Sequence, residues 1–206
     1  MRRYRQIVVS LALISACNTP PKMKADSTAT KVLNDSTVAL GGTKLQRFSA
    51  KTGAVIIKGF QETGTLRGQL QTTIIAEARE ITDASDGSRT DGITLEVKSA
   101  GAYDKSSVSY IDFDEIESLI QGIDYIAKID TTATRLASVQ ADYTTRGDLR
   151  VSSFSEQDRK MSLAVHSGSI GGTTAYLSLA QATDLKALIG KARDAVVRAR
   201  PVKPHS

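Results

Sequence analysis

The sequence is poor in the residues that build several common kinds of site. It contains no Trp, one Cys and two His, and aromatic residues make up 5% of its 206 residues. A single Cys excludes a disulfide within the chain, and one Cys with two His supplies too few soft ligands for a structural zinc site. Aromatic residues are also scarce for a surface on which bases or sugars would stack. We expect neither a bound metal nor a cofactor.

The composition is otherwise that of a globular protein, with 40% hydrophobic and 24% charged residues. It excludes a collagen, a coiled-coil rod, a low-complexity tail and a polytopic membrane protein. The formal net charge of +5 arises at the two ends, because residues 1–16 hold three arginines and the chain from Lys191 onward carries +4. Residues 17–190 therefore carry about −2, which does not favour a polyanion as the partner.

The first 17 residues have the features of an export signal. Three arginines precede a short apolar run at residues 7–14, which is too short to span the roughly 30 Å of a bilayer core as a helix. The next residues, Ile14-Ser15-Ala16-Cys17, resemble the lipobox of bacterial lipoproteins. That resemblance implies cleavage before Cys17, attachment of a diacylglyceryl group to its thiol and acylation of its new amino group. We therefore predict residues 1–16 to be a signal peptide and Cys17 to be the lipid attachment site.

The residues after Cys17 predict where the anchored chain would lie. Residue 18 is Asn and not Asp, and the sorting rule of Gram-negative lipoproteins then implies the outer membrane. Residues 17–43 are interpreted as the lipidated N-terminus and a polar, flexible tether with an end-to-end distance of about 25–30 Å. We expect the membrane to be a partner through the lipid on Cys17 and the folded part to face the periplasm. The alternative is a chance apolar N-terminus with a buried, free Cys17.

Hydrophobic periodicity predicts the elements that follow residue 44. A period of two indicates strands and a period of 3.6 indicates amphipathic helices. The expected strands are residues 53–60, 69–79, 93–98 and 107–113, then 139–145, 149–155, 161–166 and 173–179. A helix beginning near Asp114 follows the first four strands, and a helix carrying Leu185 to Val197 follows the second four. Turns are expected at Thr63-Gly64 and at residues 83–88, among others.

Strands followed by a helix, twice over, predict an internal duplication. We expect one α+β domain at residues 44–200, made of two ββββα-type halves at about 44–130 and 135–200, with a tail at 201–206. Because the links are too short for parallel crossovers, the expected sheet is antiparallel, and two amphipathic helices pack on it over a shared core. Each predicted helix contains one glycine, Gly122 or Gly190, which indicates a close approach of helix to sheet.

The tandem order is similar to the PUR-repeat and Whirly-like folds that bind single-stranded nucleic acid. The similarity is strongest at Tyr110-Ile111-Asp112-Phe113-Asp114-Glu115-Ile116 and at residues 122–126. The resemblance implies a nucleic-acid partner, which would require a basic groove with stacking aromatic residues. Phe60, Tyr143 and Phe154 are the candidate aromatic residues of the strands, and we expect them to pack in the core or at an edge. Nucleic-acid binding is thus an alternative function, and we do not expect nucleic acid as the partner.

Three groups of residues are candidates for a catalytic or metal site. His166 lies at a strand end beside Ser167 and Ser169, but the surrounding sequence lacks a nucleophile elbow, and we expect a solvated turn histidine. Asp83, Asp86 and Asp91 lack the spacing of a calcium loop, which favours a flexible polar hairpin loop. Asp112, Asp114 and Glu115 begin a helix, and we expect them to cap it. We therefore predict that the protein is not an enzyme.

The C-terminal helix carries a cluster of basic residues: Lys186, Lys191, Arg193, Arg198 and Arg200. They could contact anionic lipid headgroups or an acidic envelope polymer, or they could be solvated cations that complement the helix dipole. The function we expect is a non-catalytic binding or structural module of the cell envelope, with an envelope protein or anionic polymer as partner. The alternatives are the nucleic-acid-binding module and an envelope hydrolase, which a deep pocket joining His166 to a carboxylate would favour.

Overall fold

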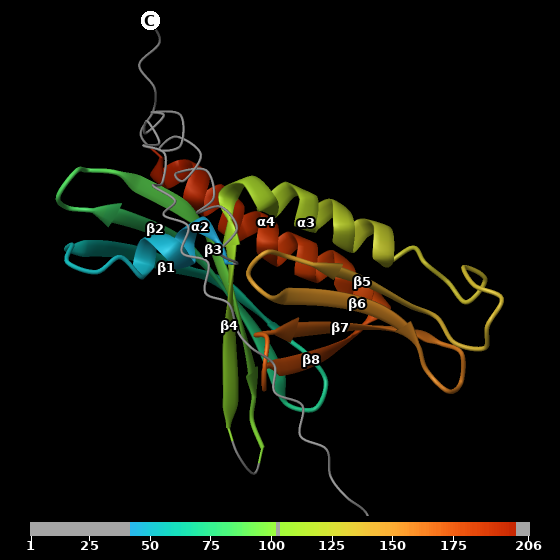
Figure 1. Ribbon diagram of the computed structural model, residues 1–206. Coiled ribbons are helices and arrows are strands. Elements are labelled where there is room, and N and C mark those ends of the chain that lie inside the picture. Colours follow the sequence, from blue (N-terminus) through green and yellow to red (C-terminus); the bar gives the residue numbers. More distant parts are fainter. Residues whose placement is uncertain (1–41, 102–103, 201–206) are drawn as a thin grey trace, which may run out of the picture. The chain divides into compact units, whose positions relative to one another are not determined.

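A computed structural model describes residues 42–101 and 104–200 (Figure 1). The predicted signal peptide, Cys17, nearly all of the predicted tether and the tail at 201–206 lie outside the described residues. Within the described part of the chain, no helix is both long and apolar enough to cross a membrane.

The described chain forms two four-stranded antiparallel sheets and their helices. The first half is built of α2 (Lys44–Ser49), β1 (Ile56–Arg67), β2 (Thr72–Asp83), β3 (Arg89–Ser99), β4 (Lys105–Asp112) and α3 (Phe113–Ile126). The second half is built of β5 (Gln140–Thr144), β6 (Leu149–Ser155), β7 (Met161–Ser167), β8 (Thr173–Ser178), a short 3₁₀ turn (Leu179–Gln181) and α4 (Ala182–Ala199). Each sheet is a simple meander, in the orders β1-β2-β3-β4 and β5-β6-β7-β8. The predicted α+β fold with two ββββα halves is confirmed.

The helices connect the two halves. The helix of the second half, α4, packs on β1, β2 and β3 of the first sheet, whereas α3 contacts β5 and β6 as well as β3 and β4. The two helices also pack against each other, side by side in Figure 1. Because each helix lays part of its apolar stripe on strands of the other half, neither half encloses its core alone.

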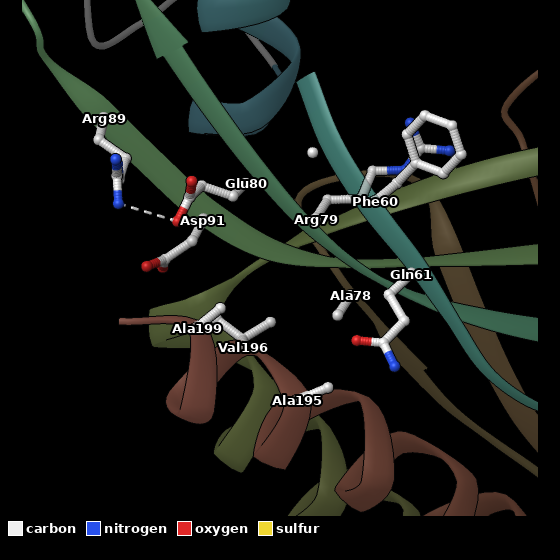
Figure 2. A pocket seen from close by; sticks show the side chains of 11 residues that line it. Phe60, Gln61, Ala78, Arg79, Glu80, Arg89, Asp91, Ala195, Val196 and Ala199 are labelled. Atoms are coloured by element: carbon white, nitrogen blue, oxygen red, sulfur yellow. Dashed lines mark hydrogen bonds and ion pairs between the residues drawn. The ribbon is translucent and has the colours of Figure 1, made fainter. Parts of the chain in front are cut away.

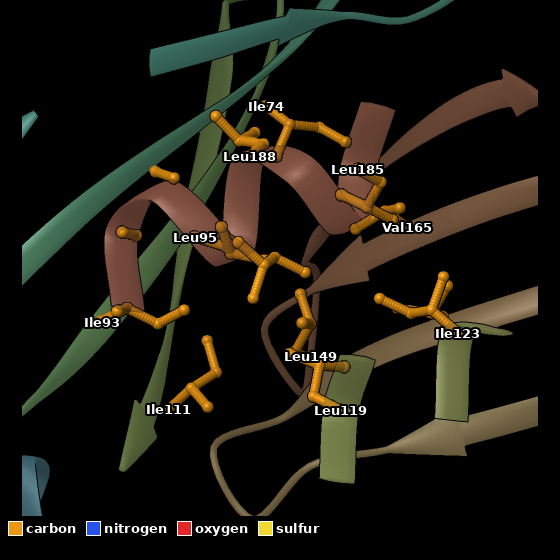
Figure 3. Packing of buried hydrophobic residues seen from close by; sticks show 14 of the residues in the cluster. Ile74, Ile93, Leu95, Ile111, Leu119, Ile123, Leu149, Val165, Leu185 and Leu188 are labelled. Atoms are coloured by element: carbon orange, nitrogen blue, oxygen red, sulfur yellow. The ribbon is translucent and has the colours of Figure 1, made fainter. Parts of the chain in front are cut away.

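A single core cluster joins residues from both halves, as the sequence predicted. Figure 3 shows residues of both sheets in this cluster, Ile93 and Leu95 from the first and Leu149 and Val165 from the second, with Leu119 and Leu185 contributed by the two helices; all six are fully buried. Burial of an apolar side chain of this size contributes about 1.5–3 kcal/mol, so the shared core makes folding of the two halves interdependent.

Two elements differ from the sequence-based expectation. The expected turn at Thr63-Gly64 is a β-bulge, where the register shifts between Glu62 and Gly64 and β1 continues to Arg67. The actual hairpin turn lies at residues 68–71, where Leu70 and Gln71 adopt positive φ. Gly64 therefore marks a bulge and not a turn. The true turn was missed because its two residues with positive φ are Leu70 and Gln71, and neither is a residue type typical of turns.

The short helix α2 was not predicted. Six residues are too few to show a helical period, but Thr43 and Gln46 form a capping box at its start. Its one buried residue, Leu45, packs onto Gly92 of β3, where a Cβ atom would come within 2.7 Å of the leucine side chain. The helix thereby covers one end of the outer face of the first sheet, which is the face turned away from the core.

The two helix glycines predict opposite mutational effects. A Cβ at Gly122 would overlap the ring of Tyr143 on β5, whereas nothing lies within 4 Å of a Cβ at Gly190. The expected close approach is therefore confirmed for Gly122 and wrong for Gly190. We expect Gly190→Ala to raise the free energy of unfolding by about 0.5–1 kcal/mol, and Gly122→Ala to lower it by about 1–3 kcal/mol. Urea unfolding of both variants checks this, and equal stabilisation by both would contradict the packing of α3 on β5.

Candidate functional site

The structure separates the residues that a hydrolytic site would have to bring together. His166 lies within β7, half-buried, with Nδ1 2.9 Å from the hydroxyl of Thr174, so the expectation of a solvated turn histidine is wrong. The neighbouring Ser167 points to the opposite face of the sheet. Its buried hydroxyl lies 2.8 Å from that of Ser109 and donates to the backbone carbonyl of Ser107. Ser167 thus links the two sheets and is not oriented toward His166.

The three aspartates near the β2–β3 hairpin have different partners. Asp83 is buried and accepts hydrogen bonds from the backbone and hydroxyl of Ser85 and from Lys51. Asp86 accepts from the backbone of Ser88, and Asp91 binds Arg200 at the end of α4. Within residues 42–101 and 104–200, no group of three or more His, Cys, Asp or Glu is placed to hold a metal ion.

Asp83 and Asp124, the latter on α3, make stability depend on pH in the acid range. Hydrogen bonds from Ser85 and Lys51 lower the pKa of Asp83 from 3.8 to about 2, and those from Lys128 and Lys186 lower the pKa of Asp124 likewise to about 2. Because the unfolded chain takes up these protons near pH 3.8, their stabilising effect is complete above about pH 5 and is lost as the pH falls through 2. We expect Asp83→Asn to be less stable than wild type at pH 6 in urea unfolding, and the difference to shrink toward zero near pH 2. A difference independent of pH would contradict this.

The carboxylates at the start of α3 form a junction between elements. Asp112 does not cap its own helix; its two oxygens accept from the backbone N–H groups of Lys44 (2.8 Å) and Leu45 (3.0 Å), which begin α2. Glu115 is also buried and accepts from the backbone N–H of Arg146 in the β5–β6 turn (2.9 Å). The prediction that these acids cap α3 is therefore corrected for Asp112 and Glu115, which fix neighbouring elements.

Asp114, the third of these acids, is exposed and forms ion pairs with Lys44 and Arg146. Burial opposes ionisation of Asp114, but these two cations outweigh it and hold its pKa below the ordinary value. Arg146 also lies 3.4 Å from an oxygen of Glu115. The three carboxylates and these two cations therefore form a network that holds neighbouring elements together.

An aromatic and cationic row crosses the outer face of the first sheet. Phe60 on β1 is 68% exposed, and the guanidinium of Arg79 on β2 lies 5.6 Å from its ring centre and 5.8 Å from that of Tyr110 on β4. Thr94 and Glu77 fix the guanidinium through hydrogen bonds of 3.1 and 2.6 Å. The row is preorganised, and its ring at the sheet edge is open to solvent. Phe60 was expected to pack, so its exposure is a correction.

The other two candidate aromatic residues do pack. Tyr143 lies against Gly122 and the core, and its hydroxyl donates to Ser118. Phe154 on β6 meets Tyr176 on β8 edge to face, with ring centres 6.3 Å apart. These contacts leave no run of parallel, exposed rings along the strands that the structure describes.

The charges on the outer faces of the two sheets nearly balance. Strand register places the following charged residues on the outer face of the first sheet: Lys58, Glu62, Arg67, Glu77, Arg79, Glu96 and Lys98. Glu77 pairs with Arg79 and Glu96 with Lys98. The outer face of the second sheet carries Asp142 and Arg150. Neither face has the basic groove that single-strand nucleic-acid binders use.

A groove opens on the inner face of the first sheet, between β1 to β3 and the C-terminal end of α4. It encloses about 250 Å³. Figure 2 shows small side chains lining it, with Gln61, Asp91 and the pair of Glu80 and Arg89 also at the groove. Glu80 binds Arg89 at 3.1 Å, and Asp91 binds Arg200 at 2.6 Å. This inner groove was not predicted; its sequence signal is a set of small inward-facing residues, Gly59, Ala78, Ala195 and Ala199.

Three of the five basic residues of α4 and its end are neutralised within the molecule. Lys186 pairs with Asp124 at 2.6 Å and Arg193 with Glu117 at 3.0 Å. Arg200 binds both oxygens of Asp91 and lies 3.5 Å from the ring centre of Phe113. Lys191 and Arg198 form no ion pair with the described residues, so little free positive charge is left for a polyanion.

These surfaces define the candidate site as the end of the first sheet near β1, with the aromatic row on one face and the inner groove on the other. Comparison of the chain with protein-family models, with curated proteins and with solved structures found no match in any of the three.

Proposed function

We propose that the protein is a lipoprotein anchored to the outer membrane through Cys17, whose α+β domain binds a partner in the cell envelope without catalysing a reaction. The observation that carries the proposal is the sequence Ile14-Ser15-Ala16-Cys17, preceded by arginines and a short apolar run and containing the only cysteine of the chain. A thiol consumed by acylation leaves an exported protein without a reactive free cysteine.

The described surfaces support a binding role. The aromatic row and the inner groove place apolar and charged groups at one end of a rigid sheet, which is typical of a recognition surface. His166 is held by a hydroxyl, and Ser167 faces the other side of its sheet. This arrangement supports the non-catalytic function over the envelope hydrolase.

The balance of charge bears on the class of partner. The basic residues of α4 are largely paired, and the outer sheet faces are nearly neutral. Both features support an envelope protein as the partner over an anionic polymer. They also support this function over single-stranded nucleic-acid binding, which relies on many unpaired Lys and Arg.

Loss of the acyl attachment point is expected to remove the protein from the outer membrane. In a Gram-negative host, we expect the wild-type chain in the outer-membrane fraction and Cys17→Ala outside it. One acyl chain holds a protein only marginally, and two or three hold it stably, so the redistribution should be nearly complete. Immunoblots of fractionated cells measure it.

The sorting residue provides a matched control for this experiment. Asn18→Asp keeps the lipid but is expected to move the protein to the inner membrane. An unchanged distribution of Cys17→Ala would contradict anchoring through Cys17. Retention of Asn18→Asp in the outer membrane would contradict only the sorting assignment.

A further inference from the structure

Strand β1 is an open edge of the first sheet. It pairs with β2 on one side, and no described strand pairs with its other side. Residues 57–62 are all exposed. Backbone N–H and C=O groups along such an edge remain available for pairing with another strand. In many proteins such an edge strand is short or strongly twisted, which hinders its pairing with another chain. β1, in contrast, is regular from Ile56 until its bulge after Glu62.

The exposed side chains of β1 follow a self-complementary pattern. Lys58, Phe60 and Glu62 alternate along the outer face, with an exposed ring midway between opposite charges. Neither charge pairs with another described residue, although neighbouring strands on this face contain the pairs Glu77–Arg79 and Glu96–Lys98. The unpaired charges therefore lie along a strand whose free edge could meet a partner.

We propose that two copies of the chain pair through β1 in antiparallel orientation, about a two-fold axis at Phe60. In this register Lys58 lies opposite the partner's Glu62, and Glu62 opposite the partner's Lys58. Phe60 lies opposite the partner's Phe60. Directly opposed residues have Cβ atoms about 4.5–5.5 Å apart, and aromatic and opposite-charge pairs at that distance stabilise a sheet. The two first sheets then form one continuous eight-stranded sheet.

The charges specify this register over its neighbours. A slip of the two-fold axis to Lys58 or to Glu62 would oppose like charges. A slip to Gly59 or to Gln61 would place Lys58 or Glu62, respectively, opposite the partner's Phe60, so no opposite charges would meet. With the axis at Phe60, two residues that line the inner groove also meet across the dimer. Gly59 lies opposite the partner's Gln61, and Gln61 lies opposite the partner's Gly59. The inner grooves of the two copies therefore lie side by side across the dimer interface, and the exposed Ile57 is part of that interface. An isologous contact of this kind closes as a dimer.

Charge reversal tests the register. Sedimentation of the detergent-solubilised full chain is expected to show a dimer. Lys58→Glu or Glu62→Lys converts two attractive pairs per dimer into repulsive ones, so each should weaken dimerisation by about tenfold or more. The double variant Lys58→Glu/Glu62→Lys restores opposite charges and should restore the dimer. Lys98→Glu, on the same face but two strands away from the edge, is the matched control and should leave dimerisation unchanged.

Cysteine cross-linking tests the axis independently. Only a residue on the two-fold axis meets its own counterpart, so Phe60→Cys should form a disulfide-linked dimer under mild oxidation, in a chain whose Cys17 is replaced by Ala. Thr65→Cys in the same background lies beyond the bulge and should not. A monomeric chain would overturn the proposal and leave β1 open to a strand of another protein. A dimer insensitive to charge reversal, or not restored by the double variant, would also overturn it.

Discussion

Replacement of Gly147 by alanine is expected to lower the free energy of unfolding by about 3 kcal/mol. Gly147 lies buried in the β5–β6 turn, where a Cβ atom would overlap the backbone carbonyl of Tyr110 on β4 and come within 2.9 Å of Thr43. The obstacle is backbone of another strand, which cannot rotate away as a side chain can. Overpacking of this kind costs about 1–3 kcal/mol and more where the neighbours are rigid.

Gly101→Ala is the matched control for this substitution. Gly101 has nothing within 4 Å of an added Cβ, so its replacement should leave stability unchanged or raise it by up to about 1 kcal/mol. Urea unfolding followed by circular dichroism measures both variants. A Gly147→Ala chain as stable as the control would contradict the close contact between the β5–β6 turn and β4.

Removal of the Asp112 carboxylate is expected to lower the free energy of unfolding about as much as Gly147→Ala does. The side chain of Asp112 is 1% exposed, and its oxygens satisfy two backbone N–H groups at the start of α2. Hydrogen bonds to a charged group contribute about 1.5–3 kcal/mol, and a buried donor left unpaired adds its desolvation cost. We therefore expect Asp112→Ala to lower the free energy of unfolding by about 3 kcal/mol.

Two further variants separate this capping role from charge alone. Asp112→Asn keeps one acceptor oxygen and should lose about half as much stability. The side chain of Asp114 is 52% exposed and forms only surface ion pairs, so Asp114→Ala should lose about 0.5 kcal/mol or less. Equal losses for Asp112→Ala and Asp114→Ala in urea unfolding would contradict the assignment of Asp112 as the cap of α2.

Much of the fold follows from periodicity in the sequence. Alternation identified all eight strands, and the boundaries of β6 were predicted at the observed residues, Leu149–Ser155. The stripes of α3 and α4 were recognisable because each helix buries one face only. Local patterns do not state which sheet a helix covers, so the packing of α4 on the first sheet was not predictable. That arrangement depends on contacts between residues far apart in the chain.

The features that the sequence did not predict rest on such long-range contacts. Asp112 looked like a cap because it precedes a helix, but its partners, Lys44 and Leu45, are almost 70 residues away. Phe60 looked like a packing residue because it is aromatic, but it lies on the exposed outer face of an edge strand, where no helix of the described chain packs on it. The inner groove forms only where the end of α4 meets β1 to β3.

Intact-mass analysis of the protein from the membrane fraction of its native host would decide whether Cys17 carries a lipid anchor. We expect a mass that lacks residues 1–16 and includes the mass of the added acyl groups, with Cys17→Ala left unprocessed. A full-length, unmodified chain in the soluble fraction would contradict anchoring through Cys17. Binding of single-stranded nucleic acid would then be the next function to test.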